Sequence, residues 1–235
     1  LVFITENEQE NVRKLGATSQ SSVIINPVLI SGCADVGFEE KKIGKKFFKV
    51  CCLSNFSWNR GLDRIVEVAQ ILKNDSHEHI KFTVIGDIKL SKRLPGKLGE
   101  VARNGGDLSE YASVSGVADM FEFVGHVSNP KSFLSECDVL VKPSREFNPW
   151  GRDILEAMAL GKPAISIGTY NGFIRNRETG VLLSQYRPRE LTDAIVWLSQ
   201  NPTITKEMGE RAKKLVQEIC SIPVAAKRLT DVWIN

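Results

Sequence analysis

Continuous apolar runs, each flanked by polar residues, recur through the middle of the chain. They lie at residues 47–54, 80–86, 121–125, 138–144 and 163–168. A short run of this kind is typical of a parallel strand that is buried on both faces of a sheet. No run approaches the roughly 20 apolar residues that a membrane-spanning helix needs.

Between these runs, apolar residues recur at helical spacing. The first such segment carries them at Leu62, Ile65, Val66, Ala69 and Leu72. Together these positions form one face of a helix. Further helices are predicted at 130–136, from about residue 150, at 189–200, and at about 205–219 and 224–234. Strands that alternate with helices predict an α/β fold with a doubly wound, Rossmann-like parallel sheet.

Three regions fall outside this alternation. The start of the chain predicts a short strand at 2–5, a polar helix and a second strand at 23–25, which an Asn-Pro pair then ends. Residues 32–46 are rich in Gly, Lys and Glu and predict a linker or surface excursion. Residues 87–106 have weak periodicity and predict an irregular insertion with room for one helix.

The composition fits a globular protein with a sizeable core. Of 235 residues, 42% are hydrophobic and 25% are charged, which suits one large domain or a domain with attached pieces. Basic residues exceed acidic ones by only 31 to 28, so neither nucleic acid nor an anionic membrane is indicated as the main partner. The chain begins without a methionine, which suggests a fragment whose upstream signals are not visible.

The cysteines predict neither a disulfide framework nor a zinc site. There are five of them, with no CxxC pair and no histidine at metal-ligand spacing. A scattered, odd-numbered set with mostly apolar neighbours is typical of reduced, buried thiols in a cytosolic protein.

The loop SNFSWNRG follows the first strand of the predicted sheet and ends at a helix. In open α/β sheets, ligands bind beyond the carboxyl ends of the strands. Arg60 is suited to clamp a phosphate with two hydrogen bonds, and Gly61 lets the backbone approach a ligand. Taken alone, the loop is more typical of a solvated arginine beside an ordinary helix start.

A second loop, PSREFNPWGRD, leads into the helix that begins near residue 150. Gly151 leaves the N–H groups of the first turn open, which forms an anion site. Arg152 opposes the helix dipole unless an anion compensates it, which favours a phosphate ligand there. Glu156, partly buried by its apolar neighbours, is suited to accept hydrogen bonds from a sugar diol.

A third loop, residues 168–180, carries three glycines, at 168, 172 and 180. Glycines let backbone amides approach a ligand, although loops also use them for turns.

These loops and their neighbours, taken together, resemble a known family. The carrying segments are NRGLDRIVEVAQIL, FVGHV, SECDVLVKPS, NPWGRDILEAMALGKPAIS and ETGVLL. In order and spacing they resemble the nucleotide-sugar-binding domain of retaining glycosyltransferases with two Rossmann-like domains (GT-B type, glycosyl transferases group 1 family). The resemblance runs from residue 47 to residue 183 and covers over half of the chain.

The resemblance implies a set of donor-binding residues. Arg60, next to Gly61, takes the place of the basic residue that binds the donor diphosphate. Glu156 matches the second of two glutamates, the one that contacts the ribose. The first, on the sugar side, falls at Asn148, eight positions earlier, while Glu146 lies two residues before that; the choice stays open, with Glu146 preferred.

Other positions complete or qualify the implied site. His126, after FVGH at a strand end, is a candidate donor contact by its position, as are Gly151 and Arg152. Two residues depart from the family's pattern: Asn55 stands where an arginine is common, and Gly172 falls where an acidic residue is usual. These departures leave the identity of the sugar and full activity open.

The resemblance also implies an activity and a domain plan. The enzyme would be a hexosyltransferase that moves a sugar from a nucleoside diphosphate sugar, such as a UDP- or GDP-sugar, to the hydroxyl of a sugar or lipid-linked acceptor in polysaccharide or glycolipid synthesis. Residues 1–45 would end an N-terminal acceptor domain and its linker, 46–204 would bind the donor, and 205–235 would pack back toward the acceptor domain. Without that domain we expect the chain to be inactive in transfer.

Several expectations about partners and chemistry follow from the same resemblance. Charge on the leaving phosphate would be stabilised by Arg60, Arg152 and the helix N-terminus at Gly151. We expect no metal and no cofactor beyond the donor, and no nucleic-acid partner. The protein is expected in the cytoplasm, with peripheral contact to the inner face of the membrane through the absent domain.

Three other functions are compared with the same residues. A nucleotide-sugar epimerase of the same fold would bind the same ligand without an acceptor. A non-catalytic nucleotide-sugar-binding module is favoured by Asn55, Asn148 and Gly172. A dinucleotide-dependent dehydrogenase is disfavoured, because no GxGxxG follows the first strand of the main domain.

Overall fold

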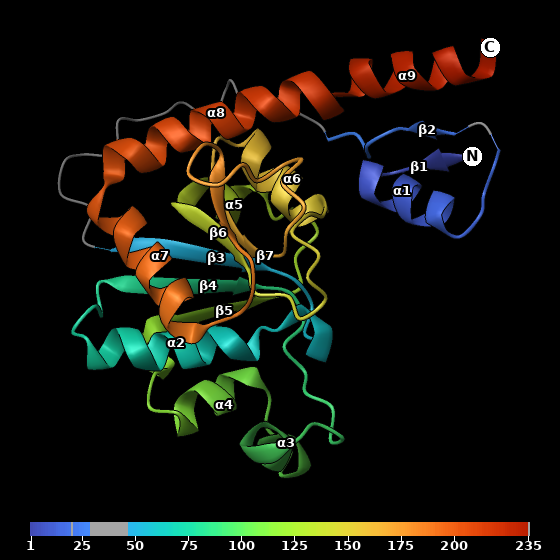
Figure 1. Cartoon of the computed structure of the whole chain (residues 1–235). Helices are drawn as coiled ribbons and strands as arrows, with labels where there is room; N and C mark the ends of the chain where they lie inside the picture. The colour runs from blue at the N-terminus through green and yellow to red at the C-terminus, as the bar shows by residue number, and fades with distance from the viewer. Residues whose placement is uncertain (20, 29–46, 235) are drawn as a thin grey trace.

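A six-stranded parallel sheet forms the centre of the molecule (Figure 1). The computed structural model describes residues 1–19, 21–28 and 47–234. The sheet has the order β5-β4-β3-β6-β7-β8, and every neighbouring pair is parallel. Its strands are β3 (Phe48–Leu53), β4 (Ile80–Ile85), β5 (Phe121–Gly125), β6 (Val139–Lys142), β7 (Ala164–Ile167) and β8 (Gly180–Leu183). The predicted doubly wound α/β fold is confirmed.

Helices cover both faces of the sheet (Figure 1). On one face α2 (Asp63–Asn74) packs against α7 (Pro188–Gln200). On the other, α6 (Arg152–Ala159) packs against α5 (Lys131–Glu136) and the long α8 (Pro202–Cys220). Each layer has its own apolar core, so the strands are buried from both sides, as their continuous apolar runs predicted.

The amphipathic pattern of the helices decides which residues enter these cores. All five residues of the predicted apolar face of α2 are buried, and Ile65, Val66, Ala69 and Leu72 are fully so. Apolar burial of this kind stabilises a folded protein by roughly 25 cal/mol per Å². The helix therefore holds the β3-to-β4 crossover firmly against the sheet.

The chain reverses its direction of winding between β3 and β6. From β3 it passes through α2 to β4 on one side, whereas from β6 it passes through α6 to β7 on the other. The loops that leave these two adjacent strands therefore diverge to opposite faces and open a crevice at the carboxyl edge. The predicted Arg60 and Gly151 loops are the two loops that border this crevice.

The start of the chain forms a separate small unit. Strands β1 (Val2–Phe3) and β2 (Ser22–Val23) pair in parallel around α1 (Glu6–Lys14), as the sequence predicted. The last helix, α9 (Ile222–Ile234), continues from α8 toward this unit (Figure 1). A cavity of about 630 Å³ between them is lined by residues of both, among them Gln9, Ile24, Arg228 and Asp231. The linker predicted at residues 32–46 lies outside the described residues.

The structure has two elements that the sequence did not predict. The helix predicted within residues 87–106 is α3 (Gly96–Arg103), and it pairs with a second helix that was not predicted, α4 (Leu108–Val114). Asp107 starts α4 by accepting hydrogen bonds from the amides of Ser109 and Glu110. Strand β8, at the edge of the sheet, was not predicted as a strand.

The four cysteines that the structure describes are buried and free, as predicted: Cys51, Cys52, Cys137 and Cys220. Burial raises the pKa of the Cys220 thiol to about 12, which keeps it protonated and unreactive at neutral pH. Cys33 lies outside the described residues. Within the described part of the chain, no helix combines the length and the apolar character of a membrane span.

Candidate functional site

The loop after β3 places Arg60 at the carboxyl edge of the sheet. A short 3-10 helix, η1 (Trp58–Arg60), begins where the Ser57 hydroxyl accepts a hydrogen bond from the amide of Arg60. Gly61 ends it with φ 72°, and a Cβ there would lie 2.2 Å from the carbonyl oxygen of Pro143. Only glycine fits this conformation so close to a neighbouring backbone. The chain therefore turns sharply into α2 and leaves the Arg60 side chain exposed at the edge.

A small depression joins the Arg60 loop to the start of α6. It is lined by Leu53, Ser54, Arg60, Leu62, Val141, Lys142, Pro143 and Asp153. Two segments that are about 90 residues apart in the chain thus meet at the crevice between β3 and β6. The structure brings together the arginine and the helix N-terminus that the sequence analysis placed on separate loops.

The first turn of α6 presents open backbone amides. Gly151 precedes the helix, and no side chain caps it. Uncapped N–H groups at a helix N-terminus carry partial positive charge and attract anions. This turn faces the same edge as Arg60, so the two features can act on one anionic ligand.

A buried ammonium group supports this turn from below. Lys142, at the end of β6, donates to the carbonyl oxygen of Trp150 at 2.6 Å and to Asp153 Oδ1 at 3.3 Å. The side chains of Lys142 and Asp153 are only 6% and 13% exposed. Sequence analysis missed Lys142, although a lysine at the end of the apolar run DVLVK was the available signal.

Arg152 and Glu156 form an ion pair on the surface of α6. Arg152 Nε lies 2.8 Å from Glu156 Oε1, with the side chains 81% and 16% exposed. Glu156 therefore supplies the compensation that the sequence argument sought in a phosphate. Arg152 therefore does not need an external anion, because the carboxylate of Glu156, one turn later, already pairs with it. The roles of both residues in donor binding stay predictions.

Glu146 and Asn148 lie on the loop between β6 and α6. Glu146 Oε1 accepts a hydrogen bond from Asn59 Nδ2 at 3.0 Å, which ties it to η1 beside Arg60. Asn148 is half-buried, and between them Phe147 takes φ 50°, a conformation that is uncommon for a residue other than glycine. The structure thus places Glu146 on the Arg60 side of the loop, and the choice between the two sugar-side candidates stays a prediction.

The remaining candidates lie further from the crevice. His126 is exposed and follows β5 at the edge of the sheet, two strands away from β3. Asn55 accepts a hydrogen bond from the amide of Asp87 at 2.8 Å and so joins the loops after β3 and β4. Gly172 packs against Tyr170, whose hydroxyl donates to Glu6 at 2.6 Å. Asn55 therefore has a structural role at the position where the family often has an arginine.

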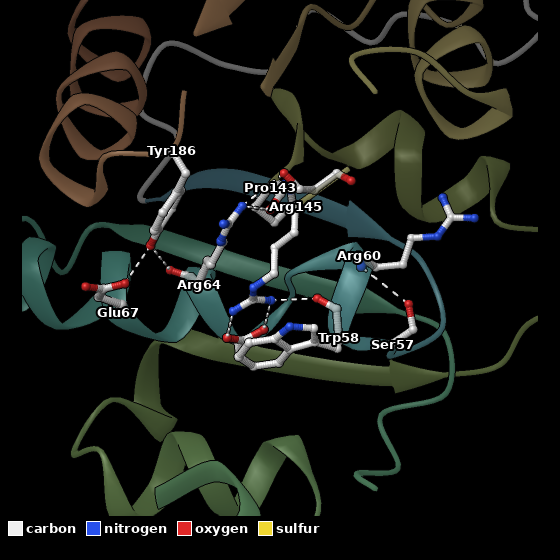
Figure 2. Close-up of polar contacts among 10 residues, drawn as sticks. Ser57, Trp58, Arg60, Arg64, Glu67, Pro143, Arg145 and Tyr186 are labelled. Carbon is white, nitrogen blue, oxygen red and sulfur yellow. Dashed lines mark hydrogen bonds and ion pairs between the residues drawn. The ribbon is translucent and has the colours of Figure 1, made fainter. Parts of the chain in front are cut away.

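Two arginines that the sequence analysis did not single out join the loops of the site (Figure 2). Arg145 reaches from the β6 loop to Asp63 and to the carbonyl oxygen of Trp58. Arg64 donates from α2 to the carbonyl oxygens of Pro143 and Ser144, at 3.0 Å and 2.9 Å. These contacts join positions about 80 residues apart, so no local pattern could reveal them.

The surroundings of Arg64 are partly buried and affect its charge. Its guanidinium carbon lies 4.1 Å from the centre of the Tyr186 ring, and the Tyr186 hydroxyl donates to Glu67 at 2.7 Å. Burial, followed by the charge of Arg145, lowers the pKa of Arg64. Burial and the hydrogen bond to Glu67 raise the pKa of Tyr186. Among the described residues, Arg64 is thus held by contacts with an aromatic ring and with carbonyl oxygens, and not by an ion pair.

In the part of the chain that the structure describes, no group of three or more His, Cys, Asp or Glu side chains is arranged to hold a metal ion. The site is built instead from basic side chains, helix amides and carboxylates. Such a set can bind an anionic, hydroxyl-rich ligand through charge-assisted hydrogen bonds.

The comparisons with known proteins agree on one family. The model of the family described as glycosyl transferases group 1 matches residues 35–215. A glycosyltransferase of Methanocaldococcus jannaschii, itself uncharacterized, is 27% identical over 188 residues, which cover 77% of this chain and 44% of the relative. The alpha-D-kanosaminyltransferase of Streptomyces kanamyceticus is 27% identical over 131 residues, which cover 54% of this chain and 34% of the relative. The chain spans less than half the length of these relatives.

Solved structures show the same fold. Anabaena HepE in complex with UDP superposes with a TM-score of 0.79 at 17% identity, over 99% of this chain and 62% of that one. A mutant of TarM from S. aureus, in complex with fondaparinux, alpha-GlcNAc-glycerol and UDP, superposes with a TM-score of 0.74 at 18% identity. The match covers 100% of this chain and 43% of that one. At this level of identity the likeness shows only the fold, a Rossmann-like sheet of the GT-B type. It does not show which ligand this chain binds.

Proposed function

Because the chain belongs to the glycosyl transferases group 1 family, we propose that it is the donor-binding part of a retaining glycosyltransferase. The reaction moves a sugar from a nucleoside diphosphate sugar to an acceptor hydroxyl. One observation carries the proposal: Arg60 and the uncapped first turn of α6 meet at the depression between β3 and β6. That is where an open α/β sheet binds its ligand.

A diphosphate is the group that the hydrogen-bond donors around this depression suit. Arg60 offers a planar fork of donors for phosphate oxygens, and the first-turn amides of α6 offer aligned N–H groups. Gly61 keeps the Arg60 loop close to the sheet, and Gly151 leaves the helix amides uncovered. Both loops therefore direct positive charge toward one small region.

Carboxylates on either side suit the hydroxyls of the donor. Glu156 is the ribose contact in this proposal, and it needs Arg152 to move aside or to share the phosphate. Glu146, held toward Arg60 by Asn59, is the preferred sugar-side group, with Asn148 as the other candidate. A carboxylate matches a diol because its oxygens only accept hydrogen bonds. His126 is the most distant of the proposed donor contacts.

The chemistry is electrostatic in this proposal. Negative charge grows on the departing diphosphate, and Arg60, Arg152 and the α6 N-terminus stabilise it. Removing one such donor typically lowers the rate by about 100- to 1,000-fold. A covalent glycosyl intermediate on a carboxylate is not required.

The whole enzyme extends beyond this chain in the proposal. Residues 1–45 end an acceptor domain, 46–204 form the donor domain, and 205–235 return to the acceptor side. The course of α9 toward the β1-β2 unit supports this division. The acceptor, a sugar or a lipid-linked sugar, and any contact with the inner face of a membrane belong to the absent domain. We therefore expect donor binding without transfer from this chain alone.

The test is a calorimetric titration of this chain with UDP, GDP and ADP, each free and sugar-linked. The best ligand is then repeated with Arg60→Ala and Glu156→Ala. We expect one base to bind selectively and both substitutions to weaken it by about tenfold or more. Product analysis of the longer protein decides the chemistry: a transferred sugar supports the proposal, whereas an epimerised sugar or no product contradicts it.

A further inference from the structure

Arg145 connects the two loops of the proposed site through its whole guanidinium group. Its Nη1 and Nη2 lie 2.8 Å and 2.5 Å from the two carboxylate oxygens of Asp63, and Nη1 also donates to the carbonyl oxygen of Trp58 at 2.6 Å. The guanidinium carbon lies 3.5 Å from the centre of the Trp58 ring (Figure 2). The Arg145 and Asp63 side chains are 19% and 13% exposed, so this is a largely desolvated contact.

Backbone and side-chain contacts of the neighbouring residues extend the connection. The amide of Arg145 donates to the carbonyl oxygen of Asn59 at 2.8 Å, and the Ser144 hydroxyl donates to the same oxygen at 3.1 Å. The Asn59 side chain in turn donates to Glu146. Trp58 and Asn59, the two residues of η1 before Arg60, are therefore both hydrogen-bonded to the loop after β6. The two loops form one connected unit.

Arg60 depends on this unit for its position. It is the last residue of η1, directly between the held Asn59 and the constrained Gly61. Its side chain points away from Arg145 (Figure 2), and no carboxylate among the described residues pairs with it. The place from which its side chain starts is therefore set by the backbone of η1, and Arg145 contacts that backbone at Trp58 and Asn59.

We propose that Arg145 is a positioning residue for donor binding: through Trp58 and Asn59 it holds Arg60, and through the β6 loop it holds Glu146. This inference rests on the function proposed above. Arg145 does not touch the donor. A misplacement of about 1 Å in a binding group can cost as much as 100-fold in rate, so a residue that fixes the loop affects binding without making a contact.

An arginine is needed at this position because three kinds of contact are used at once. The planar fork meets both oxygens of Asp63, a further donor reaches the Trp58 carbonyl, and the flat face stacks on the indole. A lysine ammonium carries the same charge but cannot make the bidentate pair or the stack. Arg145→Lys is therefore expected to behave like a loss of function rather than like a conservative change.

The first test is a double-mutant cycle on affinity for the best-binding free nucleoside diphosphate. Arg145→Met and Arg145→Lys are each expected to weaken binding by about tenfold. In the Arg60→Ala background, Arg145→Met is expected to weaken it by less than about twofold, because Arg60 is then absent and a free nucleoside diphosphate has no sugar for Glu146 to contact. Additive effects, or unchanged affinity in Arg145→Met, would overturn the inference.

The matched control is Arg189→Met. Arg189 also pairs with an aspartate, Asp75, but at the opposite end of α2. Its loss is expected to leave affinity unchanged. A general loss of ion-pair stability would weaken binding in both variants, and that result would also count against a positioning role.

The second test needs no nucleotide and is hydrogen exchange of the ligand-free chain. In Arg145→Met the amides of residues 57–61 are expected to exchange at least about tenfold faster than in the unchanged chain. Amides of β4 and the Arg189→Met variant serve as references that should not change. If the unchanged chain binds no nucleoside diphosphate, the proposed function fails, and this exchange result still decides whether Arg145 fixes the loop. Unchanged exchange at 57–61 would overturn the inference.

Discussion

Two ion pairs at the start of α6 differ in how far their basic partner is exposed. Lys142 and Asp153 lie beneath the first turn, 6% and 13% exposed, and Lys142 also holds the carbonyl oxygen of Trp150. Arg152 extends from the outside of the same turn and is 81% exposed, whereas its partner Glu156 is only 16% exposed. The two pairs are a few residues apart in sequence, yet both members of one pair are enclosed by the protein, whereas the arginine of the other faces water.

The difference separates fixed charge from exchangeable charge. A buried pair cannot open without leaving a charge in a desolvated place, so it serves as framework. A pair whose arginine is exposed contributes about 0–1 kcal/mol, and that arginine exchanges partners at little cost. The proposed phosphate site therefore combines a rigid helix start with an arginine that is free to move from Glu156 to a ligand.

Breaking the buried pair should have the largest effect. Lys142→Met leaves Asp153 without its partner and is expected to lower the free energy of unfolding by about 3–5 kcal/mol. Chemical denaturation followed by circular dichroism measures it. The double variant Lys142→Met, Asp153→Leu removes both charges and should recover most of the loss. A single variant as stable as the unchanged chain would show that the pair is not framework.

Crowding the buried pair should have the next largest effect. A Cβ on Gly151 would lie 2.5 Å from both Lys142 Nζ and Asp153 Oδ1. Gly151→Ala must therefore push the two groups apart, and we expect a loss of about 1–3 kcal/mol in the free energy of unfolding. The same substitution in the Lys142→Met background should cost less, since one of the two obstructing atoms is gone. Equal costs in both backgrounds would contradict this explanation.

Removing the exposed arginine should barely change stability but should change binding. Arg152→Ala is expected to alter the free energy of unfolding by less than about 0.5 kcal/mol. Affinity for a nucleoside diphosphate should fall by about three- to tenfold, because a mobile positive charge is lost. Denaturation and calorimetry on the same variant give both quantities. A stability loss as large as that of Lys142→Met would remove the distinction between the pairs.

Salt should give the smallest and most selective effect. Raising the ionic strength from about 0.05 M to about 0.5 M shortens the screening length severalfold. The stability change caused by Arg152→Ala should shrink further, whereas that caused by Lys142→Met should stay nearly constant, since buried charges are little screened. Denaturation curves at the two salt concentrations test this. Equal salt dependence of both variants would place the two pairs in similar surroundings.

The sheet and its main helices could be predicted because their signals are local. Strand β3 is a continuous apolar run, and α2 carries its buried face at helical spacing. The edge strand β8 could not, because it begins with glycine, which is depleted in strands, and follows a polar loop with no break. Helix α4 was missed although Asp107, with Glu110 three residues later, is a helix-start signal.

For the candidate site, the sequence predicted which loops carry it but not the side-chain pairs that connect those loops. Arg60 and Gly151 were placed correctly at strand ends, since parallel strands bring their carboxyl ends to one edge. The pairing of Arg152 with Glu156 was readable from their spacing of four residues and was overlooked. The pairing of Arg145 with Asp63 joins residues 82 positions apart, and only the folded sheet brings them together.

Hydrogen exchange of this chain with and without its best-binding nucleoside diphosphate tests the proposed donor site most directly. We predict that protection increases at residues 59–61 and 151–154, where Arg60 and the first turn of α6 meet the diphosphate. Protection confined to another region, such as the cavity between β2 and α9, would contradict it and would place the ligand outside the crevice between β3 and β6.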